Sequence, residues 1–152
     1  MPPTKILVFS DVHANPAAAD AAMDLAAELG AESWICLGDV VGYGDAPAET
    51  VSRFREGGGV VLRGNHDAAV TDDRLLASFS GEARSSVRRH RQLLSASDAN
   101  WLATLPLEHR LPGLRFAHAS LPEPEKFRYL TASRKAELLE PENLVRIVTV
   151  GA

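Results

Sequence analysis

Hydrophobic residues gather in five short runs along the chain, and each run is flanked by polar or helix-forming residues. The runs cover residues 6–9, 34–37, 60–62, 114–117 and 145–150. Each is shorter than a typical helix, and most positions within it are β-branched or otherwise apolar. This pattern predicts strands that are buried on both faces of a sheet.

The segment between the first two runs has the sequence pattern of a helix. Asn15 is suited to the N-cap, Pro16 to the first turn and Gly30 to the position just beyond the C-cap, so we predict a helix over residues 16–29. Within it, apolar residues recur at three- and four-residue spacing: Ala18, Ala22, Leu25 and Leu29. We expect that face of the helix to pack on the sheet.

Four more segments have helical patterns, at residues 47–55, 80–94, 99–105 and 131–139. The first ends before three consecutive glycines, and Ser97-Asp98 is suited to cap the third. The alternation of strands and helices predicts an α/β fold with a parallel sheet. Because the chain shows neither a repeat nor a linker, residues 1–152 are expected to form a single domain.

Composition and charge narrow the range of partners. The 152 residues are 45% hydrophobic and 24% charged, which is typical of a globular protein. A net charge of -4 gives no electrostatic reason to expect nucleic acid or an anionic membrane as a partner, because such partners need a concentrated positive surface. The single cysteine, Cys36, lies in an apolar run and is expected in the core. With no signal peptide or membrane-length apolar stretch, we expect a cytoplasmic location.

Reactive side chains follow four of the five runs. They are Asp11 and His13 after the first run, Asp39 after the second, Asn65, His66 and Asp67 after the third, and His118 after the fourth. Open α/β sheets form their ligand crevice at the carboxyl ends of the strands. We therefore expect these side chains to meet at one edge of the sheet.

The chemistry of this set favours a divalent transition metal. Carboxylate, imidazole and amide groups form a mixed oxygen and nitrogen donor set that suits Mn²⁺, Fe, Ni²⁺ or Zn²⁺. One carboxylate can bridge two cations, and Asp39 is the natural centre of such a site. Gly38 and Gly64 would let the backbone turn sharply and approach closely. Taken alone, an aspartate after a strand is more often a turn former, so it is the combination that indicates a site.

Two other histidines lack such a setting. His90 lies in the string Arg88-Arg89-His90-Arg91 within a predicted helix, and this string is typical of a solvated helix face. His109 does not follow an apolar run either. We assign neither histidine a catalytic role.

The ordered motifs Asp11-x-His13, Gly38-Asp39, Gly64-Asn65-His66-Asp67 and a later His118 resemble those of the calcineurin-like metallophosphoesterases. The likeness is to a small prokaryotic phosphodiesterase-type branch. It implies a layered α/β sandwich and a dinuclear centre. In that centre Asp11 and His13 bind one cation, Asn65 and His118 bind the other, and Asp39 bridges both. Two Mn²⁺ ions are the first expectation, with Fe, Ni or Zn as alternatives.

The resemblance also implies a reaction, the hydrolysis of small phosphate mono- or diesters. Two cations about 4 Å apart can share a hydroxide that attacks the phosphorus in line. His66 would stabilise or protonate the leaving oxygen, and Asp67 would orient the ring of His66. No serine or cysteine is paired with a base as a covalent nucleophile, which agrees with direct attack by hydroxide.

The sequence departs from the family pattern near its end. The family carries a Gly-His-Thr-His motif after a late strand, whereas here the run 145–150 is followed by Gly151 and Ala152. We therefore expect either a shortened form of a longer enzyme, with much of the second sheet missing, or a chain that is completed by association into a homo-oligomer.

Two other functions stay open at this stage. A non-catalytic scaffold on the same fold would have no chemical need for His66 and five candidate ligands. An unrelated phosphoacceptor or nucleotide-binding protein would leave Asn65, His66 and His118 unexplained, and no glycine-rich phosphate loop precedes a helix. Substrate identity is open, because it depends on loops such as 43–47 and 122–128.

Overall fold

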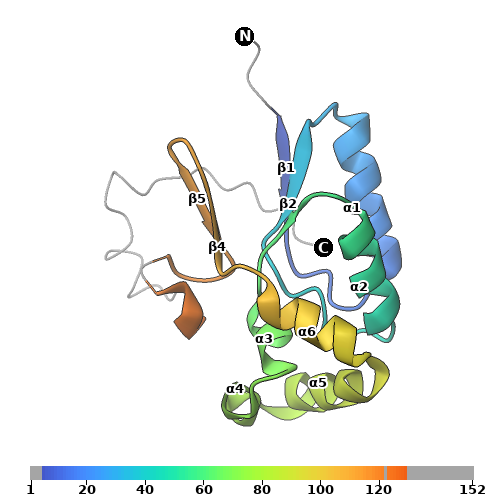
Figure 1. The fold of residues 1–152 in the computed structure, drawn as a ribbon, viewed down its shortest axis with the longest axis vertical. Coiled ribbons are helices and arrows are strands. Elements are labelled where there is room, and N and C mark those ends of the chain that lie inside the picture. The colour runs from blue at the N-terminus through green and yellow to red at the C-terminus, as the bar shows by residue number, and fades with distance from the viewer. Residues whose placement is uncertain (1–4, 122, 130–152) are drawn as a thin grey trace.

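The computed structural model describes residues 5–121 and 123–129 and has a mixed α/β architecture (Figure 1). The elements are, in chain order, β1 (Ile6–Phe9), α1 (Pro16–Glu28), β2 (Ser33–Cys36), α2 (Pro47–Glu56), β3 (Val60–Val61), α3 (Asn65–Ala69), α4 (Asp73–Ser78), α5 (Gly81–Leu93), α6 (Ala96–Thr104), β4 (Glu108–Leu111), β5 (Leu114–Ala117) and the 3-10 helix η1 (Pro124–Lys126). The predicted α/β class is confirmed.

The first three strands form a parallel sheet in the order β1-β2-β3. Phe9 lies opposite Cys36, and Cys36 lies opposite Val61. The connections between these strands contain α1 and α2, which contact each other and lie on the same side of the sheet in Figure 1. This is the strand-helix-strand arrangement that the sequence predicts.

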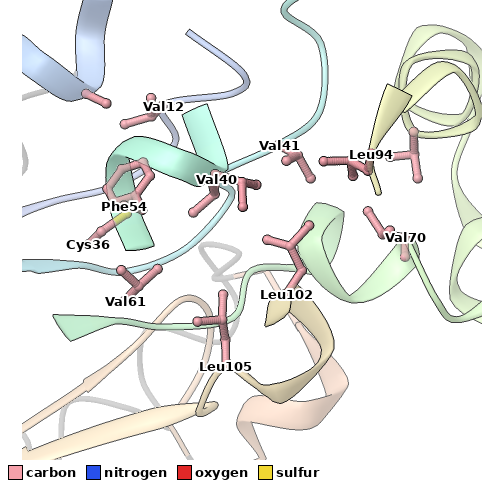
Figure 2. Packing of buried hydrophobic residues seen from close by; sticks show 14 of the residues in the cluster. Val12, Cys36, Val40, Val41, Phe54, Val61, Val70, Leu94, Leu102 and Leu105 are labelled. Atoms are coloured by element: carbon pink, nitrogen blue, oxygen red, sulfur yellow. The ribbon is translucent and has the colours of Figure 1, made fainter. Parts of the chain in front are cut away.

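Alternate residues of the strands pack on opposite faces of the sheet. Cys36 and Val61 belong to the larger core cluster, together with Phe54 of α2 and Leu102 of α6 (Figure 2). The opposite face contributes Ile35 to a second cluster, in which it packs with residues of the β4–β5 hairpin. The strands are therefore covered on both faces, because hydrophobic side chains project to each side in turn.

The run 114–117 forms a strand as predicted, but the expectation that it joins the parallel sheet is wrong. It is β5, which pairs antiparallel with β4, with Arg110 opposite Arg115. Strand β4 has the sequence Glu-His-Arg-Leu, so no apolar run marks it. The hairpin nevertheless packs Phe116 against the sheet, and this contact fixes the segment that carries His118.

Helix α1 has the predicted ends but a different packing face. The side chain of Asn15 accepts a hydrogen bond from the backbone of Ala18 at 3.1 Å, and Gly30 has a φ of 63°. The buried residues are Ala19 and Ala26, whereas Leu25 is 39% exposed and Leu29 is 53% exposed. The prediction that both leucines pack on the sheet is wrong. The small alanine side chains form the buried face instead.

Several shorter elements differ from the sequence prediction. Helices α3 and α4 occupy a stretch for which no helix is predicted. Helix α6 begins earlier than expected, and its cap is Ser95, whose hydroxyl accepts from the backbone of Asp98 at 3.1 Å. The predicted segments 131–139 and 145–150 lie outside the described residues. In the part of the chain that the structure describes, every helix is too short or too polar to cross a membrane.

Candidate metal centre

The loops after β1 and β2 lie side by side and are joined by backbone hydrogen bonds. Asp11 donates to the carbonyl of Gly38 at 3.0 Å, and His13 donates to the carbonyl of Asp39 at 3.0 Å. Among the described residues, five of the six non-glycine residues with positive φ lie in these two loops. Each such conformation costs about 1–3 kcal/mol, and strain of this kind concentrates at functional sites.

Two glycines let the loops after β2 and β3 touch. A Cβ atom on Gly38 would come within 2.5 Å of the backbone nitrogen of Gly64, and one on Gly64 would overlap the carboxylate of Asp39. Gly38 also has a φ of 124°, which other residues rarely adopt. The close backbone approach expected from the sequence is present.

The candidate ligands converge on Asp39. Its Oδ2 atom lies 3.5 Å from Nε2 of His118 and 3.8 Å from Nε2 of His13. His13 is also 3.5 Å from Oδ1 of Asp11, and His118 is 3.1 Å from Oδ1 of Asn65. Asp39 therefore lies between two groups of side chains, with Asp11 and His13 in one and Asn65 and His118 in the other.

The chemistry of this cluster fits a divalent cation. Asp11, Asp39 and His118 offer ligand atoms that all lie within 4.8 Å of one another. Asp39 is 3% exposed, and two carboxylates brought this close repel each other unless positive charge compensates them. Carboxylate oxygens together with imidazole nitrogen are ligands that first-row divalent metals accept.

The histidines of the cluster do not share one protonation preference. Burial lowers the pKa of His13 and His118, but the nearby carboxylates, above all those of Asp11 and Asp39, outweigh burial and raise both. For His66, burial lowers the pKa and outweighs the attraction of Asp39. His66 therefore favours the neutral imidazole, unlike the two histidines that lie beside carboxylates.

Asp67 connects the loops of the site. Its Oδ2 accepts from the backbone of Asp39 at 2.8 Å and of Gly64 at 2.9 Å, and its Oδ1 accepts from Val41 at 3.1 Å. Burial and the charge of Asp39 raise the pKa of Asp67 to about 7, although its N–H partners favour the carboxylate. Among the described residues no hydrogen bond joins Asp67 to the ring of His66, whose Nδ1 has no partner, so the expected contact between the two side chains is absent.

His66 lies between the ligand cluster and a pocket. Its backbone donates to Oδ1 of Asp39 at 3.0 Å, and its ring centroid lies 5.0 Å from that of His13. Within the described residues, its Nδ1 atom is buried without a hydrogen-bond partner. His66 and Asn65 line a pocket of about 340 Å³, together with Tyr43 and Phe79. The side chain thus lies between the cluster of candidate ligands and this pocket.

Sequence reasoning missed His90. The sequence predicts a solvated helix face for this residue, but it is 0% exposed. Its Nδ1 accepts from the backbone of Gly42 at 3.1 Å, and its Nε2 donates to the carbonyl of Gly44 at 2.7 Å. One signal was available, because Val87, His90 and Leu94 recur at three- and four-residue spacing and all three are buried.

The parallel sheet and the ligand-bearing loops at the ends of its strands define an α/β protein with a candidate divalent-metal centre. The family model of calcineurin-like phosphoesterases matches residues 4–147. The chain therefore belongs to the calcineurin-like phosphoesterase family.

Two individual proteins are similar to this chain over most of its length. The chain is 32% identical over 129 residues to Uncharacterized protein MJ0912 of Methanocaldococcus jannaschii, covering 82% of this chain and 53% of that protein. The crystal structure of a metallophosphoesterase from Sphaerobacter thermophilus matches with a TM-score of 0.71 and 30% identity, over 91% of this chain and 56% of that one.

A third relative shares the fold at lower identity. The hypothetical protein PH1004 from Pyrococcus horikoshii OT3 matches with a TM-score of 0.60 and 18% identity, over 70% of this chain and 50% of that one. In all three comparisons the chain spans about half the length of the relative, at 53%, 56% and 50%.

Proposed function

We propose that this chain carries the site of a metal-dependent phosphoesterase that hydrolyses small phosphate mono- or diesters. Asp11 and His13 would hold one divalent cation, Asn65 and His118 the other, and Asp39 would bridge them. The observation that carries the proposal is the position of Asp39 Oδ2, which lies 3.8 Å from His13 and 3.5 Å from His118. Membership of the calcineurin-like phosphoesterase family supports the same reaction.

When bound, two such cations supply Lewis acidity and activate a water molecule for attack on phosphorus. Residues of the chain itself would supply the other parts of the reaction, which are hydrogen-bond donation to the leaving oxygen and positioning of the ligands. His66, whose pKa is lowered by burial, is neutral near pH 7 and still carries one N–H, which is suited to donate a hydrogen bond to the leaving oxygen. Asp67 would act as a positioning residue, since it holds the backbone of Asp39 and Gly64 in place.

The proposal also covers the identity of the metal and of the binding partners. Mn²⁺ is the first choice and Fe, Ni²⁺ or Zn²⁺ are alternatives, because the donor set is mixed oxygen and nitrogen. The partner is a small phosphoester rather than nucleic acid or a membrane, in keeping with the net charge of -4. Cytoplasmic location and association with a second copy stay predictions.

Hydrolysis of bis(p-nitrophenyl) phosphate and p-nitrophenyl phosphate in the presence of Mn²⁺ tests the proposal. Turnover should disappear with a chelator and in Asp39→Asn, while His109→Ala, which changes a histidine outside the cluster, should keep it. His66→Ala should retain metal and lose about 100-fold or more in kcat. A folded chain that hydrolyses neither ester with any of the four metals would contradict the proposal.

A further inference from the structure

His90, a buried histidine of helix α5, lies against the loop that borders the candidate active site. The Nδ1 atom of His90 accepts from the backbone of Gly42 at 3.1 Å, and its Nε2 donates to the carbonyl of Gly44 at 2.7 Å. Both ring nitrogens are therefore used by one short loop, and the proton of the neutral ring lies on Nε2. Neither bond is needed to hold α5 together, since both partners are backbone atoms of the loop.

The residue between these two hydrogen bonds is Tyr43, which has a φ of 56° and is 42% exposed. Its ring centroid lies 4.8 Å from that of His13 and 4.9 Å from that of His66. It also lines the pocket of about 340 Å³ beside His66. A left-handed conformation at a non-glycine residue persists only when its surroundings hold it.

The loop is held from two sides. Gly44 donates to the carbonyl of His13 at 3.2 Å, on the side of the metal cluster. On the side of α5, Arg89 donates to the carbonyl of Tyr43 at 3.0 Å, but this arginine side chain is 48% exposed. The side chain of His90, by contrast, is 0% exposed and its hydrogen bond from Gly42 is buried, so His90 is the stronger constraint on the loop.

We propose that His90 is a positioning residue that acts through Tyr43. By hydrogen bonding to Gly42 and Gly44, the imidazole fixes the loop and holds the Tyr43 ring in the pocket wall beside His66. There the Tyr43 ring contacts the organic group of the phosphoester. The inference rests on the proposed function. Histidine suits this role because one rigid ring supplies an acceptor and a donor to two backbone groups of the same loop.

The test compares kcat, KM and bound Mn²⁺ for the full chain and its variants with bis(p-nitrophenyl) phosphate. His90→Phe keeps a planar ring but loses both hydrogen bonds, and it should lower kcat/KM about 10- to 100-fold with unchanged metal content. His90→Gln, whose amide offers an acceptor and a donor, should restore most of the activity. His109→Phe, a matched histidine substitution away from the site, should keep the wild-type kinetics.

A double-mutant cycle separates positioning from general damage. Tyr43→Ala should itself lower kcat/KM, and adding His90→Phe should then cost less than about threefold, because the two residues act as one unit. Equal losses in both backgrounds, or wild-type kinetics in Tyr43→Ala, would overturn the inference. The second result is decisive even if His90→Phe does not fold, because Tyr43 is exposed. Failure of the proposed function is distinct: the wild-type chain itself would then show no turnover, which overturns both.

Discussion

Nε2 of His118, at the end of the β4–β5 hairpin, lies 3.5 Å from Oδ2 of Asp39, at the end of the parallel sheet. Two separate sheets therefore contribute to one cluster of ligands. The hairpin is held against the parallel sheet by the cluster that contains Phe116 and Ile35. The candidate metal centre thus depends on hydrophobic packing that lies away from the candidate ligands themselves.

Phe116→Ala is expected to weaken both the fold and metal binding. Phe116 is 8% exposed, and truncation of a buried phenylalanine costs about 3 kcal/mol or more. The loss should also release His118 and lower the affinity for Mn²⁺. Chemical denaturation and a Mn²⁺ titration measure the two effects.

Leu114→Ala is the matched control on the same strand, since Leu114 is 37% exposed. Its unfolding free energy should change by about 0.5 kcal/mol or less. Unaltered Mn²⁺ affinity in a folded Phe116→Ala variant would show that the hairpin contact does not position His118.

Gly64→Ala is expected to abolish metal binding. A methyl group there would overlap the carboxylate of Asp39 and the backbone nitrogen of the same residue, and neither can move without breaking the loop. Gly58→Ala provides the comparison, because a Cβ on Gly58 meets no atom within 4 Å and only its φ of 73° is unfavourable. That variant should lose about 1 kcal/mol of stability and keep the metal. Wild-type Mn²⁺ affinity in Gly64→Ala would contradict the observed packing.

His90 should make the folded chain less stable at mildly acidic pH. Burial lowers the pKa of His90 below its ordinary value of 6.5, and protonation would remove the acceptor for the backbone of Gly42. Below about pH 6.5 the unfolded chain takes up a proton at this residue while the folded chain does not, so the free energy of unfolding falls as the pH falls. Above that pH both states are neutral, and the effect vanishes.

The measurement is the free energy of unfolding of the metal-free chain at pH 7.5 and 5.5, for the wild type and for His90→Gln. Because other histidines titrate in both proteins, the difference between them isolates His90. The wild type should lose more of its free energy of unfolding than the variant over this range. An identical pH dependence for both proteins would contradict a lowered pKa.

The positions of Asp11, His13, Asp39 and Asn65 could be predicted from the sequence because each follows an apolar run that forms a strand of the parallel sheet. Strands β1, β2 and β3 are joined by helices and therefore pair in parallel. Their carboxyl ends meet at one edge of the sheet, whichever side chains pack around them. The helix cap at Asn15 could be predicted for a similar reason, since the cap is a local contact with Ala18.

Long-range packing could not be predicted in the same way. Strand β4 carries few apolar residues, so its sequence does not predict a strand. It is recognised as one only by its pairing with β5 in the structure. His90 is surrounded by arginines in the sequence, yet it lies on the inner side of α5 because the helix turns that side toward Gly42 and Gly44. The carboxylate of Asp67 binds backbone groups of three loop residues, which no sequence spacing indicates.

The most direct test of the central proposal is the number of Mn²⁺ ions bound per chain, measured by titration and by electron paramagnetic resonance for the wild type, Asp39→Asn and His66→Ala. If Asp39 bridges two cations, the wild type and His66→Ala should each bind about two exchange-coupled ions, and Asp39→Asn should lose affinity at both positions. Equal metal content in Asp39→Asn, or a wild-type signal from isolated ions only, would contradict a bridged dinuclear centre.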